Sequence, residues 1–132
     1  MKRDMDFIRE LLLEIEGGKK AFATMTSETA KALGLEDEPR PTPQECDRLS
    51  GHLDLLEQGG LVEIDAKTAE CYYLRSMTWA GHDFLDGVRD EETWEKTKAG
   101  AAAVKNWSFE TLKDIGAGLV KKQIEHWTDV KL

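Results

Sequence analysis

Two Gly-Gly pairs, and the helix signals in front of them, limit the fold of this chain more than any other feature. Gly17-Gly18 ends an amphipathic segment that starts at Asp4 or Asp6, and Gly59-Gly60 ends another that starts after the prolines at 41 and 43. Glycine adopts the left-handed conformation that closes helices, so both pairs are predicted to be helix ends. The segments they close are therefore predicted to be helices, over residues 4–16 and 43–58.

Strand-forming residues follow the second glycine pair directly. The runs LVEIDA (61–66) and CYYL (71–74) are joined by a polar turn around Lys67-Thr68, which predicts a β-hairpin. The remaining predicted elements are a short strand at 21–25, a short helix at Ser27–Leu33, an exposed proline-containing loop at 36–43, and helices at 78–89, 92–104 and 108–127.

This order predicts a mainly α chain with a small β-hairpin, which is an α+β fold. Helix, short helix, helix, hairpin and helix is the succession typical of a winged helix-turn-helix domain. We expect that domain over residues 1–90. Residues 91–132 are expected to form a C-terminal helical extension that packs on the domain or on a second subunit.

Composition favours a globular protein that does not enter membranes. Apolar residues make up 40% of the 132 residues, yet no stretch approaches the roughly 20 apolar residues of a membrane span. The start of the chain carries charges within its apolar run, so we expect neither a signal peptide nor an anchor. Cys46 and Cys71 lack CxxC spacing and are expected to be buried, reduced thiols of a cytoplasmic protein.

Two sequence blocks carry a resemblance to known proteins. The stretch HLDLLEQGGLVEI followed by YYLRSMTWAGHDFL resembles the winged-helix pattern in which a Thr-x-x-Gly-x-x-Phe-Leu helix follows the wing. The N-terminal M-K-R-D-M-D and the later W-x-G-H-D-F-L-D-x-x-R-D resemble a family of small uncharacterised proteins of bacteriophages and prophages, catalogued as a domain of unknown function. The resemblance implies the cytoplasm of a bacterial host and supplies no catalytic residues.

The residues predict neither an enzyme nor a cofactor site. The dipeptide His82-Asp83 occurs in metal-dependent phosphohydrolases, but such a site needs further His ligands, and only His52 and His126 remain. Neither cysteine has a His at a recognisable spacing, and no glycine-rich phosphate loop is present. Gly116 and Gly118 are instead expected to allow close helix packing.

The helix predicted at 78–89 has two contrasting faces. Helical spacing places Met77, Gly81, Phe84, Leu85 and Val88 on one face and Trp79, His82, Asp86, Arg89 and Asp90 on the opposite one. One interpretation is that the later helices, with Trp94, Trp107 and Trp127, fold over Trp79. The other is that this face binds another protein or a second copy of the chain.

The helix at 43–58 occupies the position that usually enters DNA in a winged-helix domain. Its outward face is acidic, and residues 1–66 carry a net charge of −7 of the chain's total of −8. DNA affinity depends mostly on Lys and Arg that neutralise phosphates, so DNA is the less favoured partner. The acidic face is either a solvated surface or a docking surface for a basic partner.

These observations predict a non-enzymatic phage or prophage protein that acts through protein–protein contacts, for example as an acidic inhibitor or adaptor of host machinery that handles nucleic acid. The alternative is a dimeric DNA-binding regulator that uses Lys2, Arg3, Lys19, Lys20 and the hairpin. The apolar stripe of the last helix either packs on its own domain or forms a homodimer. The candidate partner-binding residues are Trp79, His82, Asp86, Arg89, Trp94, Asp47, Asp54 and Leu55.

Overall fold

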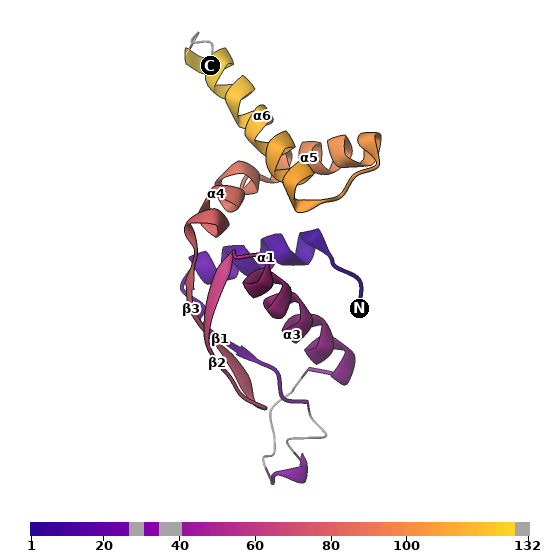
Figure 1. Ribbon diagram of the computed structural model, residues 1–132, viewed down its shortest axis with the longest axis vertical. Coiled ribbons are helices and arrows are strands. Elements are labelled where there is room, and N and C mark those ends of the chain that lie inside the picture. The colour runs from indigo at the N-terminus through magenta and orange to yellow at the C-terminus, as the bar shows by residue number, and fades with distance from the viewer. Residues whose placement is uncertain (27–30, 35–40, 129–132) are drawn as a thin grey trace. The chain divides into compact units, whose positions relative to one another are not determined.

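The structure is a computed structural model that describes residues 1–26, 31–34 and 41–128. Its elements are α1 (Met5–Glu16), β1 (Ala21–Ala23), α3 (Pro43–Gln58), β2 (Val62–Lys67), β3 (Cys71–Met77), α4 (Trp79–Val88), α5 (Glu91–Val104) and α6 (Phe109–Thr128) (Figure 1). The described chain is mainly helical with one small antiparallel sheet, which confirms the predicted α+β class.

Capping side chains fix where the two helices of the N-terminal half begin. Asp4 caps α1, because its Oδ1 accepts hydrogen bonds from the backbone N–H groups of Asp6 (3.0 Å) and Phe7 (3.3 Å). Thr42 and Glu45 form a reciprocal capping box at the start of α3. Both helices end at the predicted glycines, and Gly60 has φ of 74°, which other residues rarely adopt.

The sheet has three strands in the order β1-β3-β2. The predicted hairpin is confirmed as β2 and β3, which pair from Val62↔Met77 to Lys67↔Tyr72. The predicted short strand is confirmed as β1, which pairs with the other edge of β3. Of the predicted short helix at Ser27–Leu33, residues 27–30 lie outside the described part of the chain, as do residues 36–40 of the predicted loop.

The chain divides into two compact units, Met1–Gly81 and His82–Leu132, and the division falls within α4. The predicted winged-helix-like domain over 1–90 and the helical extension over 91–132 remain a prediction. In the first unit, α1 and α3 contact the sheet. Large apolar side chains from all of these elements are almost fully buried there, namely Leu11, Leu12, Phe22, Leu53, Leu56, Val62 and Leu74.

The second unit is held by side chains of the later helices. Phe84 contacts Phe109 with ring centroids 4.9 Å apart, and Trp94 is 1% exposed. A Cβ atom at Gly116 would lie 3.0 Å from the carbonyl oxygen of Gly87, so the expected close packing is confirmed at Gly116. At Gly118 the expectation is wrong, because a Cβ there would meet nothing within 4 Å.

The Thr-x-x-Gly sequence at residues 78–81 joins the end of the hairpin to the end of α3. Thr78 Oγ1 donates to the carbonyl oxygen of Gly60 (2.5 Å) and accepts from the backbone N–H of Gly81 (3.1 Å). Thr78 therefore caps α4, as predicted, and also binds the turn after α3. The absence of a side chain at Gly81 leaves room for the carbonyl group of Leu61.

Candidate interaction surface

The two faces of α4 are as predicted. Met77, Gly81, Phe84, Leu85 and Val88 are buried, whereas Trp79, His82, Asp86 and Arg89 are exposed. Asp86 and Arg89 form an ion pair of 2.8 Å one turn apart. Such an exposed pair stabilises a helix by about 0.5 kcal/mol or less, so its charges remain accessible to a partner.

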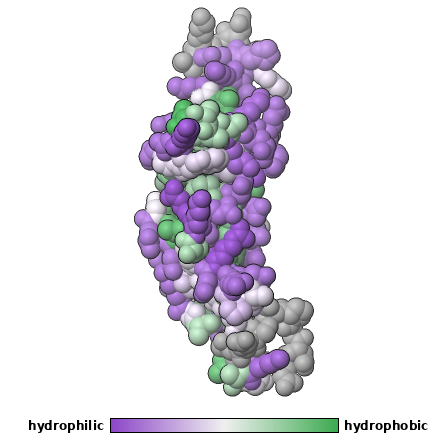
Figure 2. All heavy atoms as spheres, turned by 90° about the vertical axis from the view of Figure 1, so that its right-hand side faces the viewer, coloured by the Kyte–Doolittle hydropathy of each residue, from purple (hydrophilic) through white to green (hydrophobic). Residues whose placement is uncertain are grey.

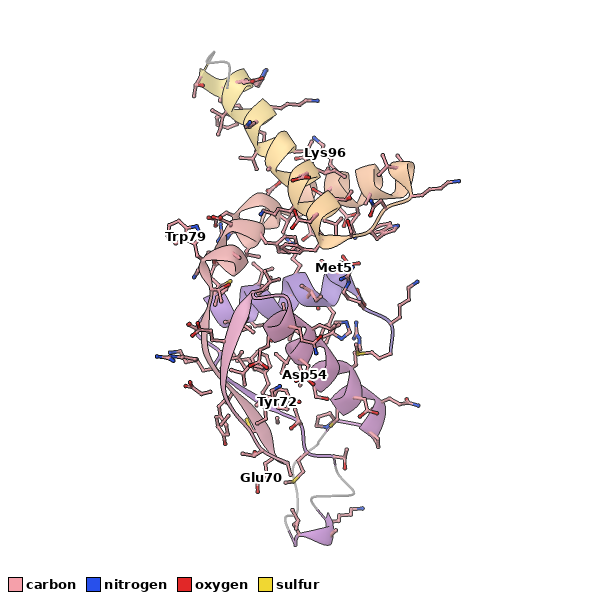
Figure 3. All side chains as sticks on the ribbon, in the orientation of Figure 1. Met5, Asp54, Glu70, Tyr72, Trp79 and Lys96 are labelled. Carbon is pink, nitrogen blue, oxygen red and sulfur yellow. The ribbon has the colours of Figure 1, made fainter. Side chains whose placement is uncertain are left out.

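The tryptophan candidates differ in exposure. Trp79 is 84% exposed and projects away from the ribbon (Figure 3). Its coverage by the later helices, which belong to the other compact unit, stays a prediction. Trp94 is corrected as a partner-binding candidate, because it is buried. Trp94 lies on the buried face of α5 together with Thr97 and Ala101, so its indole ring is not accessible to a partner.

An acidic surface forms where α3 meets the hairpin. We call it the helix–hairpin face and define it by Asp47, Asp54, Leu55 and Glu57 of α3 and Glu63, Asp65, Lys67 and Glu70 of the hairpin. Lys67 Nζ lies 2.8 Å from Asp54 Oδ1 and 3.0 Å from Glu57 Oε1. Tyr72 donates its hydroxyl hydrogen to Asp54 Oδ2 over 3.3 Å, and the two side chains adjoin in Figure 3.

These contacts change the acid–base properties of both donors. Hydrogen bonds to Asp54 and Glu57 raise the pKa of Lys67 above its ordinary value, so this ammonium stays charged and paired. Burial, together with the negative charge of Asp54, raises the pKa of Tyr72. At neutral pH the phenol is therefore a hydrogen-bond donor that orients the Asp54 carboxylate.

The other cations of α3 and the hairpin are also paired with carboxylates. Arg48 Nη2 lies 2.8 Å from Asp4 Oδ2, and its guanidinium stacks 4.1 Å from the ring centroid of Phe7. Arg75 lies 3.9 Å from Glu63. The exposed carboxylates of Asp47, Asp65 and Glu70 add further negative charge to the helix–hairpin face. Hydrophilic side chains dominate the face of the molecule shown in Figure 2.

His52 is a key residue that the sequence patterns did not single out, and it has a structural role. Its ring is fully buried, Nε2 accepts from the backbone N–H of Asp4 (2.9 Å), and Nδ1 lies 2.7 Å from the carbonyl oxygen of Arg48. Because Nε2 is an acceptor, Nδ1 carries the proton and donates it. The edge of the ring also contacts Phe7, with centroids 5.0 Å apart. His52 therefore fixes the start of α1 on α3.

Asp4 makes the stability of this junction depend on pH. Burial alone would raise the pKa of Asp4, but hydrogen bonds from Arg48 and from the backbone of Phe7 and Asp6 outweigh it and lower the pKa. The carboxylate therefore stabilises the fold above the ordinary pKa of an aspartate, and this contribution is lost as the pH falls through the lowered pKa.

We expect Asp4→Ala to lower the free energy of unfolding by about 1 to 2 kcal/mol at pH 7, because α1 loses its cap. Asp4→Asn keeps a capping oxygen, so its loss is expected to be smaller. Urea denaturation at pH 7 and pH 3 measures both effects, and the deficit of Asp4→Asn relative to wild type should shrink at pH 3. A deficit that grows on acidification would contradict this role.

The remaining candidates for chemistry are the residues considered as metal ligands and the two cysteines considered as nucleophiles. Among residues 1–26, 31–34 and 41–128, no three His, Cys, Asp or Glu side chains are arranged to hold a metal ion. Cys46 is buried as expected, whereas Cys71 is half-buried, and both are free thiols. Burial and the neighbouring Asp47 and Glu45 raise the pKa of Cys46, which keeps this thiol protonated. No helix in the described ranges has the length and apolarity to cross a bilayer.

Comparison with known proteins gives a family. A Haemophilus influenzae protein described as "Uncharacterized protein" is 26% identical over 128 residues, which cover 94% of this chain and 99% of that protein. No solved structure matches the chain. The family described as "Hypothetical protein (DUF2513)" matches residues 2–108. The chain therefore belongs to the DUF2513 family.

Proposed function

We propose that this protein has no catalytic activity and acts by binding another protein through the helix–hairpin face. The proposal rests on one observation: each cation on α3 and the hairpin, which are Arg48, Lys67 and Arg75, lies within 4 Å of a carboxylate. The same segments carry seven carboxylates, at residues 45, 47, 54, 57, 63, 65 and 70. The surface is therefore suited to a basic partner.

The topology supports a winged-helix scaffold for this role. The succession α1, β1, α3, β2, β3 and the strand order β1-β3-β2 support this part of the proposal. The reading helix of a winged-helix domain usually places cations against DNA phosphates, but here the corresponding surface would repel them. We infer an acidic inhibitor or adaptor of host machinery that normally handles nucleic acid. The phage or prophage origin and the bacterial cytoplasm belong to this proposal through the sequence resemblance.

DNA binding is the first test. We expect no shift of random duplex DNA at micromolar protein, at either low or physiological salt. A shift that weakens steeply with salt would overturn the proposal, since such dependence marks phosphate neutralisation. If Lys19→Glu and Lys20→Glu then abolished the shift, the alternative of a dimeric DNA-binding regulator would replace it.

The partner surface is the second test. Bacterial lysate is passed over the immobilised full chain and over two charge-reversal variants. Asp47→Lys is expected to reduce the captured partner by about tenfold or more, because attraction becomes repulsion at the helix–hairpin face. Asp114→Lys makes the same charge change at an exposed position of α6 and should retain the partner. Equal capture by both variants would exclude this face.

A further inference from the structure

We propose that the C-terminal part of α6 binds a second copy of this chain, with the two α6 helices antiparallel. The site lies in the second unit, so the inference does not rest on the proposed function. Of the 20 residues of α6, only Leu112 and Gly116 are buried. Ile124 is 41% exposed and Trp127 is 85% exposed, so within its own unit this helix has an uncovered apolar face.

The helix that packs on α6 lies on a different side. A Cβ atom at Gly100 of α5 would lie 3.2 Å from Ile115 Cδ1, so Ile115 faces α5. Gln123 Nε2 donates to Thr93 Oγ1 of α5 over 3.4 Å. Because a helix turns by about 100° per residue, Ile124 lies about half a turn around α6 from Ile115. The face that contains Ile124 therefore points away from α5.

The uncovered face has the spacing of a coiled-coil seam. It consists of Ala117, Val120, Ile124 and Trp127, which follow one another at intervals of three, four and three residues. Val120 is half-buried and the other three are exposed. Apolar residues that repeat every 3.5 positions form a stripe that packs against a second helix with the same spacing. Another copy of α6 supplies such a helix.

The charges beside this seam are complementary to those of an antiparallel copy. Asp114 and Lys121 flank the seam on the same side, one heptad apart, and both are exposed. We consider the antiparallel register that places Ala117 of one copy opposite Val120 of the other. In this register Asp114 of each copy lies beside Lys121 of the other, so the two-fold axis makes the ion pair twice. Neither side chain forms an ion pair with the residues that the structure describes.

A parallel pair of α6 helices is disfavoured by another cation. In a parallel coiled coil each seam position faces the same position of the other helix. Lys113 continues the seam four residues before Ala117, so it would face Lys113 of the other copy. In the antiparallel register it faces Ile124 instead. Its methylene groups then cover this apolar side chain while the ammonium group stays in water.

The oligomeric state of the full chain tests the inference. Sedimentation equilibrium at low salt is expected to give a mass that rises with protein concentration from 14.9 kDa towards twice that value. Lys121→Glu should weaken the dimer about tenfold or more, because a carboxylate then meets Asp114 of the other copy twice. Lys122→Glu makes the same charge change about 100° around the helix. This control should change dimerisation less than about twofold.

A charge exchange tests the register. The double variant Asp114→Lys/Lys121→Glu again places opposite charges in each pair, so we expect dimerisation within about threefold of the unchanged chain. Circular dichroism checks that each variant is folded. A chain that stays monomeric at every concentration would overturn the inference. A dimer that Lys121→Glu does not weaken, or that the folded double variant does not restore, would also overturn it.

The dimer and the proposed function are tested separately. The helix–hairpin face lies in the first unit, whereas the seam of α6 lies in the second. Partner capture from lysate by the Asp114→Lys control is therefore expected to be independent of dimerisation. Loss of the dimer with capture unchanged would remove this inference and leave the proposed function standing.

Discussion

His52→Ala is expected to lower the free energy of unfolding by about 3 to 5 kcal/mol, which is a large part of the stability of a domain of this size. The substitution empties the space of a fully buried ring. It also leaves the backbone N–H of Asp4 and the carbonyl oxygen of Arg48 without the partners they have at 2.9 and 2.7 Å. Unpaired buried backbone groups add their own penalty to that of the cavity. Urea denaturation followed by circular dichroism measures the change.

Two variants show whether the hydrogen bonds of His52 cause the effect. His52→Gln retains a donor and an acceptor on a side chain of similar reach, so we expect it to recover part of the loss. His126→Ala removes an exposed ring from α6 and should change the stability by less than about 0.5 kcal/mol. If His52→Ala were as mild as His126→Ala, the ring would not hold α1 on α3.

Local signals were sufficient to predict the elements of this fold. Helix α3 begins and ends at the predicted residues, with Thr42 and Pro43 at its start and the glycines at 59 and 60 at its end. These limits were predictable because capping depends on groups only a few positions apart. The faces of α4 were predicted for the same reason, since a helix repeats every 3.6 residues. The pairing of β1 with β3 joins residues about fifty positions apart and has no equally local signal.

The candidate site was predictable only in its net charge. Lys67 lies ten and thirteen residues from the two carboxylates it binds, and only the position of the hairpin beside α3 brings them together. Trp94 was chosen as an aromatic near charges, but the packing of α5 decides that it is buried. His52 has a sequence signal in retrospect: it shares the apolar face of Leu49, Leu53 and Leu56, where a histidine needs buried partners.

Gly81→Ala should test the junction between the hairpin and α4 through the sign of its effect. In most helices this change stabilises by about 1 kcal/mol, because glycine is the poorer helix former. At Gly81 the new methyl group would lie 2.5 Å from Met77 Cγ, 3.2 Å from the carbonyl carbon of Leu61, and in direct conflict with that carbonyl's oxygen. The oxygen cannot move freely, because it accepts the backbone N–H of Thr78 over 2.9 Å. We therefore expect a loss of about 2 kcal/mol or more.

Gly118→Ala is the matched control, since it makes the same chemical change within a helix where a Cβ would meet nothing within 4 Å. Helix propensity acts there without a steric conflict, so we expect a gain of about 0.5 to 1 kcal/mol. The two variants are thus expected to change the free energy of unfolding in opposite directions, as measured by urea denaturation of the full chain. A stabilising Gly81→Ala would mean that Leu61 and α4 separate at little cost. The Thr-x-x-Gly sequence would then not hold the hairpin against the end of α3.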